Sequence, residues 1–296
     1  MRRISLITLS LWLMPPLTFG QIPSEEIYVE TMPDRGENWF IGKTGNGGYI
    51  FDATTGEMQG MLSLSRYTPA VTHYWPRREF YAAESYLSRG VHGDRTDIVA
   101  VYDYENLSPI AEIEIPNYMA RLQVRNHLGL LNNGRHLAVL NMNPGHSVSI
   151  VDVEDRVFVY EASTPGCAVL MPIAENDFMQ VCGDGTLQLI QLDISGFEAN
   201  RTRSDVFFDV IEDAVFDRIA SSDDGWWLVT HRGVIFHAST EDDEIIITGK
   251  RHDFYSEYEV GYSEVGVIEG LKVTLSSKCG ISPDLSGAIN QRALLH

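Results

Sequence analysis

Cysteine is scarce in this chain of 296 residues, which contains only Cys167, Cys182 and Cys279. A structural zinc site usually needs closely spaced pairs such as CxxC with further Cys or His ligands nearby, and these cysteines form no such pattern. The sequence therefore argues against a zinc-stabilised fold. Cys167 and Cys182 flank a strand-like run, where they could remain free thiols or form a disulfide, and the cellular compartment decides between these alternatives.

Basic residues are also few. The chain has 22 Lys and Arg residues against 41 Asp and Glu residues, which gives a formal net charge of −19 at pH 7. Such an acidic surface repels phosphate backbones, so the composition argues against nucleic-acid binding and suits partners with basic patches. The acidic run 241–244 lacks the spaced oxygens and the glycine turn of a calcium loop, and we interpret it as a solvated turn.

No apolar run of membrane-spanning length follows the N-terminal segment, and that segment is itself short. Arg2 and Arg3 precede an apolar stretch, and residues 18–20 precede Gln21 like a small-residue cleavage site. Residues 1–20 are therefore predicted to be a secretory signal peptide, with residues 21–296 exported to an oxidising space and no membrane anchor. In that oxidising space a disulfide between Cys167 and Cys182 is favoured over free thiols.

A repeat organises what the chain does contain. Residues 48–62, 99–116, 148–163 and 187–196 each run from an apolar, alternating strand into a polar turn that begins with an aspartate. These aspartates are expected to accept backbone hydrogen bonds rather than to act as catalytic carboxylates, and they are Asp52, Asp103, Asp152 and Asp193. Residues 233–249 form a fifth copy, with Ala238 in place of the aspartate.

A second element precedes four of these copies. It combines a polar turn with an apolar strand and recurs at residues 76–85, 132–141, 174–183 and 222–231. Together the two elements give several strands in each period of roughly 45 residues, which is the pattern of a β-propeller blade. We predict an all-β fold in which residues 21–296 form a single β-propeller, with about six blades' worth of chain. A pair of β-sandwiches is the alternative, but a sandwich has no reason to repeat so regularly.

Motifs of self-contained catalysis are missing. The sequence has no G-x-S-x-G elbow, no HExxH helix and no dinucleotide-binding fingerprint, which argues against a self-sufficient hydrolase or metalloenzyme. Residues 42–48 (GKTGNGG) superficially resemble a P-loop but are interpreted as a turn between strands. His231 is interpreted as a strand-end histidine rather than a base or ligand. Trp226 and Trp227 are interpreted as aromatic residues packed between blades rather than a platform for substrate.

Two stretches resemble one known family. Residues 93–116 (GDRTDIVAVYDYENLSPIAEIEIP) resemble the RGxRTDxVxVxDxxTLxPxAEIxLP stretch of the heavy subunit of quinoprotein amine dehydrogenases, which include methylamine and aralkylamine dehydrogenase. Residues 165–192 resemble the GC…P…FxxxCGDGxL segment of the same family. With further matches in the same order, the resemblance extends over about residues 24–250.

The resemblance implies a seven-bladed propeller that carries no cofactor, no metal and no catalytic residue of its own. It implies that Cys167 and Cys182 form a disulfide, which would tie the predicted first strand of a blade, residues 177–182, to the segment before it. It also implies a heterotetramer with a small light subunit that carries tryptophan tryptophylquinone and oxidises primary amines to aldehyde and ammonia. A blue-copper protein of the amicyanin or azurin kind would then accept the electrons.

The sequence departs from the family in three ways, the first being that residues 21–296 are too few for seven blades of about 45 residues. The connection 42–48 is shortened and offers no equivalent of the phenylalanine that lines the amine channel in the methylamine enzymes, so the amine preference cannot be carried over. The tail 268–296 loses the strand alternation and shows no clear family match. We interpret this tail as a truncated or shifted reading frame, with Cys279 accidental, or as a six-bladed variant. The alternative function is a stand-alone periplasmic propeller that binds a ligand or another protein through one face.

Overall fold

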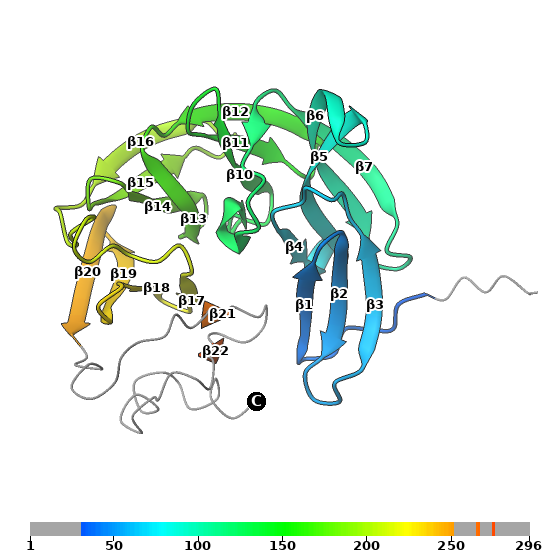
Figure 1. Ribbon diagram of the computed structural model, residues 1–296, viewed down its shortest axis with the longest axis horizontal. Coiled ribbons are helices and arrows are strands. Elements are labelled where there is room, and N and C mark those ends of the chain that lie inside the picture. Colours follow the sequence, from blue (N-terminus) through cyan, green and yellow to red (C-terminus); the bar gives the residue numbers. More distant parts are fainter. Residues whose placement is uncertain (1–30, 252–264, 267–273, 276–296) are drawn as a thin grey trace, which may run out of the picture. The chain divides into compact units, whose positions relative to one another are not determined.

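The computed structural model describes residues 31–251 together with 265–266 and 274–275. Figure 1 shows the described part as an all-β structure in which successive sheets stand side by side like the blades of a propeller. The predicted signal peptide, residues 1–20, lies outside the described residues. The same holds for the tail 268–296, including Cys279, apart from residues 274–275.

Five blades follow one another along the chain, and each is an antiparallel sheet. The first holds β1 (Trp39–Thr44), β2 (Gly47–Asp52) and β3 (Met58–Ser63), and the second holds β4 (Val71–Tyr74), β5 (Glu79–Arg89), β6 (His92–Asp103) and β7 (Pro109–Ile115). The third holds β8 (Tyr118–Met119), β9 (Leu128–Leu130), β10 (His136–Asn143), β11 (Ser147–Asp152) and β12 (Val157–Ser163).

The remaining blades have four strands each. The fourth holds β13 (Cys167–Ile173), β14 (Asp177–Cys182), β15 (Leu187–Leu192) and β16 (Glu198–Arg203), and the fifth holds β17 (Ala220–Ser222), β18 (Gly225–Val229), β19 (Val234–Glu241) and β20 (Glu244–Arg251). Two 3-10 helices, η1 (Trp75–Arg77) and η2 (Arg125–His127), join strands, and β21 (Val265–Gly266) pairs with β22 (Thr274–Leu275). The predicted all-β propeller is confirmed, with five blades in residues 31–251.

The strands of each blade end at two opposite edges, which we call the turn end and the arm end. The turn end carries the tight turns that follow Asp52, Asp103, Asp152 and Asp193. The arm end is the opposite one and carries the tip of the β5–β6 hairpin. In the third and fourth blades the hairpins β10–β11 and β14–β15 are equivalent to β5–β6. Because neighbouring strands run antiparallel, these hairpins also close at the arm end.

Apolar side chains fill the spaces between adjacent blades, because residues i and i+2 of a strand share one face of the sheet. In β5, Phe80 and Ala82 pack toward the first blade, whereas Tyr81 and Ala83 pack toward the third, and all four are fully buried. Burying an aromatic side chain such as Phe80 contributes about 1.5–3 kcal/mol. Similar clusters lie between the third and fourth blades and between the fourth and fifth, so the core is a series of layers between sheets.

The fifth copy of the repeat closes differently from the others. β19 continues through Ala238, which is buried in mid-strand, and pairs with β20 as far as Glu241 and Glu244. The turn consists of Asp242 and Asp243, with φ of 49° and 66°, and two-residue hairpin turns of this type require such positive values. This turn does not depend on an aspartate at position 238, because the strands continue past that position. The prediction of a turn at 241–244 is confirmed.

Candidate functional site

The innermost strands surround a cavity of about 550 Å³, lined by residues of β4, β9 and β13 and by the segment 221–226. Two polar side chains of its wall, Asn126 and Trp226, are engaged in hydrogen bonds within the protein. The side-chain amide of Asn126 donates to the carbonyl oxygen of Leu170 at 3.0 Å, and Nε1 of Trp226 donates to the carbonyl oxygen of Pro172 at 2.8 Å. Both bonds join neighbouring segments around the cavity, so these side chains hold its wall together.

His127 follows Asn126 on η2 and is buried. Burial lowers the pKa of its imidazole to about 4, against the opposing field of Asp217, so the ring is neutral at pH 7. Among the described residues, no hydrogen-bond partner reaches its Nδ1. A buried ring with so low a pKa is a weak proton acceptor at neutral pH, which makes His127 a core histidine rather than a general base.

Beside the cavity, three side chains superficially form a serine–histidine–aspartate set that the sequence did not reveal. The hydroxyl of Ser222 lies 3.3 Å from Nε2 of His237, and Oδ1 of Asp224 lies 3.3 Å from the same nitrogen. In a catalytic triad the aspartate holds the ring nitrogen opposite to the one that meets the serine. Here Ser222 instead donates to Asp224 at 2.8 Å. The three residues therefore form a local surface cluster at the β17–β18 turn and cannot relay a proton.

The four repeat aspartates do what the sequence predicts. Each accepts a hydrogen bond from a backbone N–H two or three residues later, at 2.7 Å from Thr54, 2.8 Å from Asn106, 2.9 Å from Asp155 and 2.8 Å from Ser195. These bonds satisfy backbone donors that the turn would otherwise leave unpaired. The aspartates are structural turn residues and are spread over four blades, so the structure does not bring them together.

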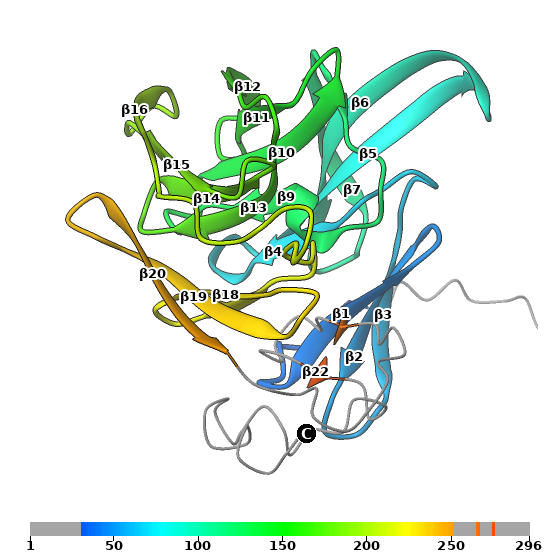
Figure 2. The same cartoon turned by 60° about the vertical axis from the view of Figure 1, so that its left-hand side comes forward.

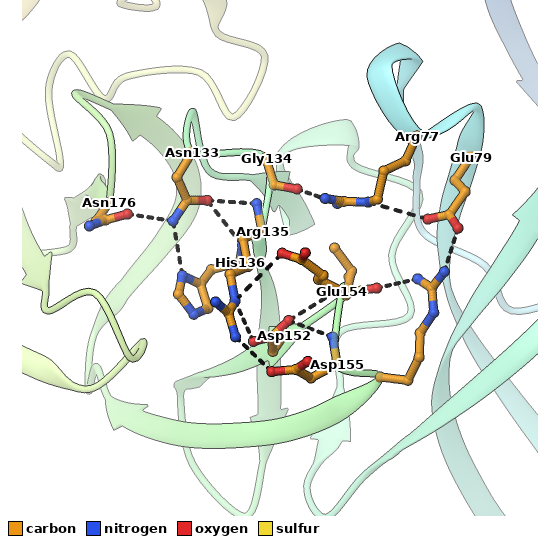
Figure 3. Close-up of polar contacts among 12 residues, drawn as sticks. Arg77, Glu79, Asn133, Gly134, Arg135, His136, Asp152, Glu154, Asp155 and Asn176 are labelled. Atoms are coloured by element: carbon orange, nitrogen blue, oxygen red, sulfur yellow. Dashed lines mark hydrogen bonds and ion pairs between the residues drawn. The ribbon is translucent and has the colours of Figure 1, made fainter.

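Polar side chains at the turn end join the second, third and fourth blades, as Figure 3 shows. Arg156, in the turn after β11, contacts the carboxylate of Glu79 at the start of β5. Tyr81 donates to the same carboxylate at 2.7 Å, and Arg77 donates to Tyr81 at 3.0 Å. Charged groups from two blades are thus paired across the space between them. The sequence placed these residues only in a polar turn, in the strand after it and in a repeat copy, because their partners in the other blade lie far away in the chain.

The same network continues around Arg135. Its Nε donates to Asp152 at 2.6 Å and its Nη2 to Asp155 at 2.6 Å. Burial alone would raise the pKa of the Asp152 carboxyl, but the backbone N–H of Asp155 and the Arg135 guanidinium outweigh it and hold that pKa below its usual range. Asn133 contacts Asn176 of the fourth blade, so the network reaches three blades. The network therefore joins the blades and has a structural role.

The segment GDRTD of the resemblance has a structural role at the arm end. Asp97 is buried, and Arg95 contacts both of its carboxylate oxygens, through Nε at 2.7 Å and Nη2 at 2.5 Å. Ser85 donates to the same carboxylate at 2.6 Å, and the backbone N–H of Met119 donates to it at 2.7 Å. Met119 belongs to the third blade, so this motif fixes the second blade to the third.

The expectations for single residues are mostly confirmed. Residues 42–48 form the β1–β2 hairpin, whose tip includes Gly45 at φ 53°, and His231 follows β18 with its ring stacked on Phe216 at 4.2 Å. Trp226 is buried between the fourth and fifth blades as predicted. The prediction is wrong for Trp227, which lies on the other face of β18 and is 37% exposed, because alternate residues of a strand face opposite ways.

Cys167 and Cys182 form the predicted disulfide and face each other on β13 and β14. The interpretation of residues 177–182 as the first strand of a blade is wrong, because residues 167–173 already form that first strand as β13. Pro172 lies within β13 and weakens its strand signal in the sequence, since proline is disfavoured in central strands. The disulfide therefore ties the first two strands of the fourth blade to each other.

In the part of the chain that the structure describes, there is neither a metal-binding cluster nor a membrane-spanning helix. No group of three or more His, Cys, Asp or Glu side chains there is arranged to hold a metal ion. No helix there has the length and apolar character to cross a membrane. What the arrangement offers is a rigid stack of blades with a central cavity and two chemically different ends.

Comparison with known proteins decides the family. A family model described as methylamine dehydrogenase heavy chain matches residues 38–259. This chain belongs to that family. The methylamine dehydrogenase heavy chain of Paracoccus versutus is 28% identical over 161 residues, which cover 54% of this chain and 37% of the relative. That of Methylobacillus flagellatus is 28% identical over 215 residues, covering 72% of this chain and 52% of the relative. The chain therefore spans about half or less of the length of these heavy chains.

A solved structure of a functionally unknown protein from Desulfotomaculum acetoxidans shares the fold. It superposes with a TM-score of 0.53 at 11% sequence identity and covers 72% of this chain and 65% of its own. At this identity the likeness concerns the fold alone. The resemblance to the heavy-chain family rests on the sequence matches.

The C-terminal region has a second similarity. A model described as molybdopterin cofactor-binding domain matches residues 228–296. Xanthine dehydrogenase/oxidase of Mus musculus is 44% identical over 55 residues, which cover 19% of this chain and 4% of that protein. The two family matches overlap at residues 228–259, and within the overlap residues 228–251 form strands of the fifth blade. The tail 268–296 lies outside the heavy-chain match, as expected, but the molybdopterin cofactor-binding model does match it.

Proposed function

We propose that this chain is the non-catalytic heavy subunit of a periplasmic amine dehydrogenase. The observation that carries the proposal is the family match over residues 38–259, and the propeller of residues 31–251 agrees with it. A light subunit carrying tryptophan tryptophylquinone would oxidise a primary amine with water to an aldehyde and ammonia, releasing two electrons and two protons. A blue-copper protein would accept the electrons. This chain would hold the light subunit in a heterotetramer and help to shape the path of the amine.

The chemistry of the described side chains fits a scaffold. The repeat aspartates accept backbone hydrogen bonds, and the charged side chains at the turn end pair with one another. Ser222, His237 and Asp224 do not form a proton relay. A subunit of this kind contributes by holding its partner in place, since positioning alone can supply much of an enzyme's rate enhancement.

Export to the periplasm is part of the same proposal. Its support is the leader-like composition of residues 1–20 and the disulfide between Cys167 and Cys182, since disulfides persist in oxidising compartments. Cell fractionation of the full chain and of a variant lacking residues 2–20 would test this. The full chain should be recovered from the periplasm with its leader removed, and the shortened variant should stay in the cytoplasm.

The function is tested by recovering the tagged mature chain from its native periplasm. The eluate is examined for a small subunit that stains for quinone and for reduction of a dye that depends on added amine. A quinone-staining partner with amine-dependent activity is the expected result. A folded chain that remains alone and inactive would contradict the proposal and favour a stand-alone binding propeller.

A further inference from the structure

The β5–β6 hairpin continues beyond its blade as a two-stranded ribbon. β5 pairs with β6 from Glu79 and Asp103 as far as Arg89 and His92. The outer strand β7 pairs with β6 only up to Asp97, and the inner strand β4 pairs with β5 only up to Ala82. Within the described residues, no third strand supports the segment 86–95, which we call the arm. Figure 2 shows the arm reaching well past the other hairpins of the same end.

The base of the arm is held firmly. Arg95 pairs with the buried carboxylate of Asp97, and its Nη2 also donates to the carbonyl oxygen of Met119 at 2.7 Å. Its guanidinium lies 4.6 Å from the ring centroid of Tyr118. These contacts fix the direction in which the ribbon leaves the blade. A two-stranded ribbon is marginally stable by itself in water, so a rigid base is what keeps the arm extended.

The arm and the loops beside it expose tyrosine, valine and arginine side chains. Tyr86 is 45% exposed and Val91 is 52% exposed, and Arg89 at the tip is exposed too. Arg66 and Arg121, exposed on neighbouring loops of the same end, both lie over the ring of Tyr67, at 6.0 Å and 4.5 Å from its centroid. In the described part of the chain, no carboxylate is paired with Arg66, Arg89 or Arg121.

These three exposed arginines at the arm end stand out in a chain of net charge −19. The exposed arginines and Tyr86 are of the residue types that are enriched at protein interfaces, and Val91 adds exposed apolar surface beside Arg89. Their complement is a surface with carboxylates around an apolar patch. Because its base is fixed, the arm also loses less conformational freedom on association than a free loop would.

We propose that the arm, together with Arg66 and Arg121, docks the light subunit of the dehydrogenase, and that the docked face of that subunit is apolar with an acidic rim. This inference rests on the proposed function, which supplies the partner. The tip of the arm would insert Val91 into the apolar patch, and Arg66, Arg89 and Arg121 would pair with the carboxylates around it.

The test compares three forms of the mature full chain for binding to a purified tryptophan tryptophylquinone light subunit of a methylamine dehydrogenase. The first is the unaltered chain, and the second carries Arg89→Glu and Val91→Ser. The third replaces Ser88–Asp94 by Asn-Gly, which closes the ribbon between Leu87 and Arg95, a pair already in register. Glu105→Lys, an exposed change of charge at the turn end, is the matched control.

The two arm variants should bind at least about tenfold more weakly than the unaltered chain, and binding should weaken as salt is added. Glu105→Lys should bind like the unaltered chain, and all forms should keep the same Tm. Arm variants that bind as tightly as the unaltered chain would overturn the docking role and leave the proposed function standing. An unaltered chain that binds no light subunit would overturn both. A chain that forms dimers lost only in the arm variants would show that the arm binds a second copy instead.

Discussion

Arg95 and Asp97, two positions apart on β6 at the base of the arm, form a bidentate ion pair whose carboxylate is completely buried. Residues i and i+2 of a strand share a face, and here that face packs against the third blade. Ser85 and the backbone N–H of Met119 also donate to the carboxylate, so each of its two oxygens accepts two hydrogen bonds. The pair therefore fixes two blades and the base of the arm at once.

Removal of the Arg95 guanidinium should lower the stability of the fold. Arg95→Ala leaves the carboxylate of Asp97 buried without its counter-charge, and we expect the free energy of unfolding to fall by about 3–5 kcal/mol. Urea denaturation of the mature chain measures it. The double variant Arg95→Met with Asp97→Leu should be less destabilised than Arg95→Ala, because it leaves no unpaired charge. A single variant within about 0.5 kcal/mol of the unaltered chain would contradict the structural role of the pair.

The parts of the fold that could be predicted from sequence are the local ones. The turn of Asp52 and those of its three equivalents depend on residues two or three positions away, so the aspartate and its partners are visible together in the sequence. The alternation of apolar residues likewise marks the middle strands of each blade. The burial of Trp226 was expected of an aromatic residue on a strand, and the opposite orientation of Trp227 could have been inferred from the alternation of strand residues.

The parts that could not be predicted depend on contacts distant in the chain. Glu79 and Arg156 are 77 positions apart and meet only because the second and third blades stand side by side. β13 was missed because Pro172 interrupts its pattern, and its neighbour β14 supplies the pairing that overrides this weak propensity. The arm has ordinary strand composition, and its extension becomes visible only when the lengths of the flanking strands are known.

The disulfide should stabilise the fourth blade. Cys167→Ser with Cys182→Ser removes a crosslink between residues 15 positions apart, and we expect a loss of about 3 kcal/mol in the free energy of unfolding. Thermal unfolding in oxidising buffer would show it as a lower Tm. Addition of a reductant should lower the Tm of the unaltered chain toward that of the double variant. Equal Tm values for the two proteins in oxidising buffer would contradict the prediction.

The lowered pKa of Asp152 makes one contribution to stability depend on pH. A carboxyl whose folded pKa lies below its unfolded value stabilises the fold above the unfolded pKa, near 4, and loses this effect as pH falls through the folded value. Asp152→Asn should therefore be less stable than the unaltered chain at pH 7, by about 1 kcal/mol after allowance for solvent screening. The difference should shrink below about pH 4. Denaturation curves from pH 3 to pH 8 measure it, and a difference independent of pH would argue against ionic stabilisation at this turn.

Glu84 should show the opposite sign. Burial raises the pKa of its carboxyl, even though Tyr86 and Tyr102 donate hydrogen bonds to it. A raised folded pKa means that protonation favours the fold, so this stabilising effect is complete below the unfolded pKa, near 4, and is lost as pH rises through the folded value. Glu84→Gln mimics the protonated form and should be more stable than the unaltered chain at pH 8, by about 1 kcal/mol, with no advantage near pH 4.

The control for Glu84→Gln is Glu112→Gln, which removes an exposed carboxylate whose field acts on the same site. It should change the Tm little at any pH, because an exposed charge is solvated in both the folded and the unfolded chain. Thermal unfolding of the three proteins between pH 4 and pH 8 separates the two effects. If Glu84→Gln were less stable at pH 8 and equally so at pH 4, the hydrogen bonds from Tyr86 and Tyr102 would outweigh the cost of burying the charge, and the carboxylate would be the form that the fold prefers.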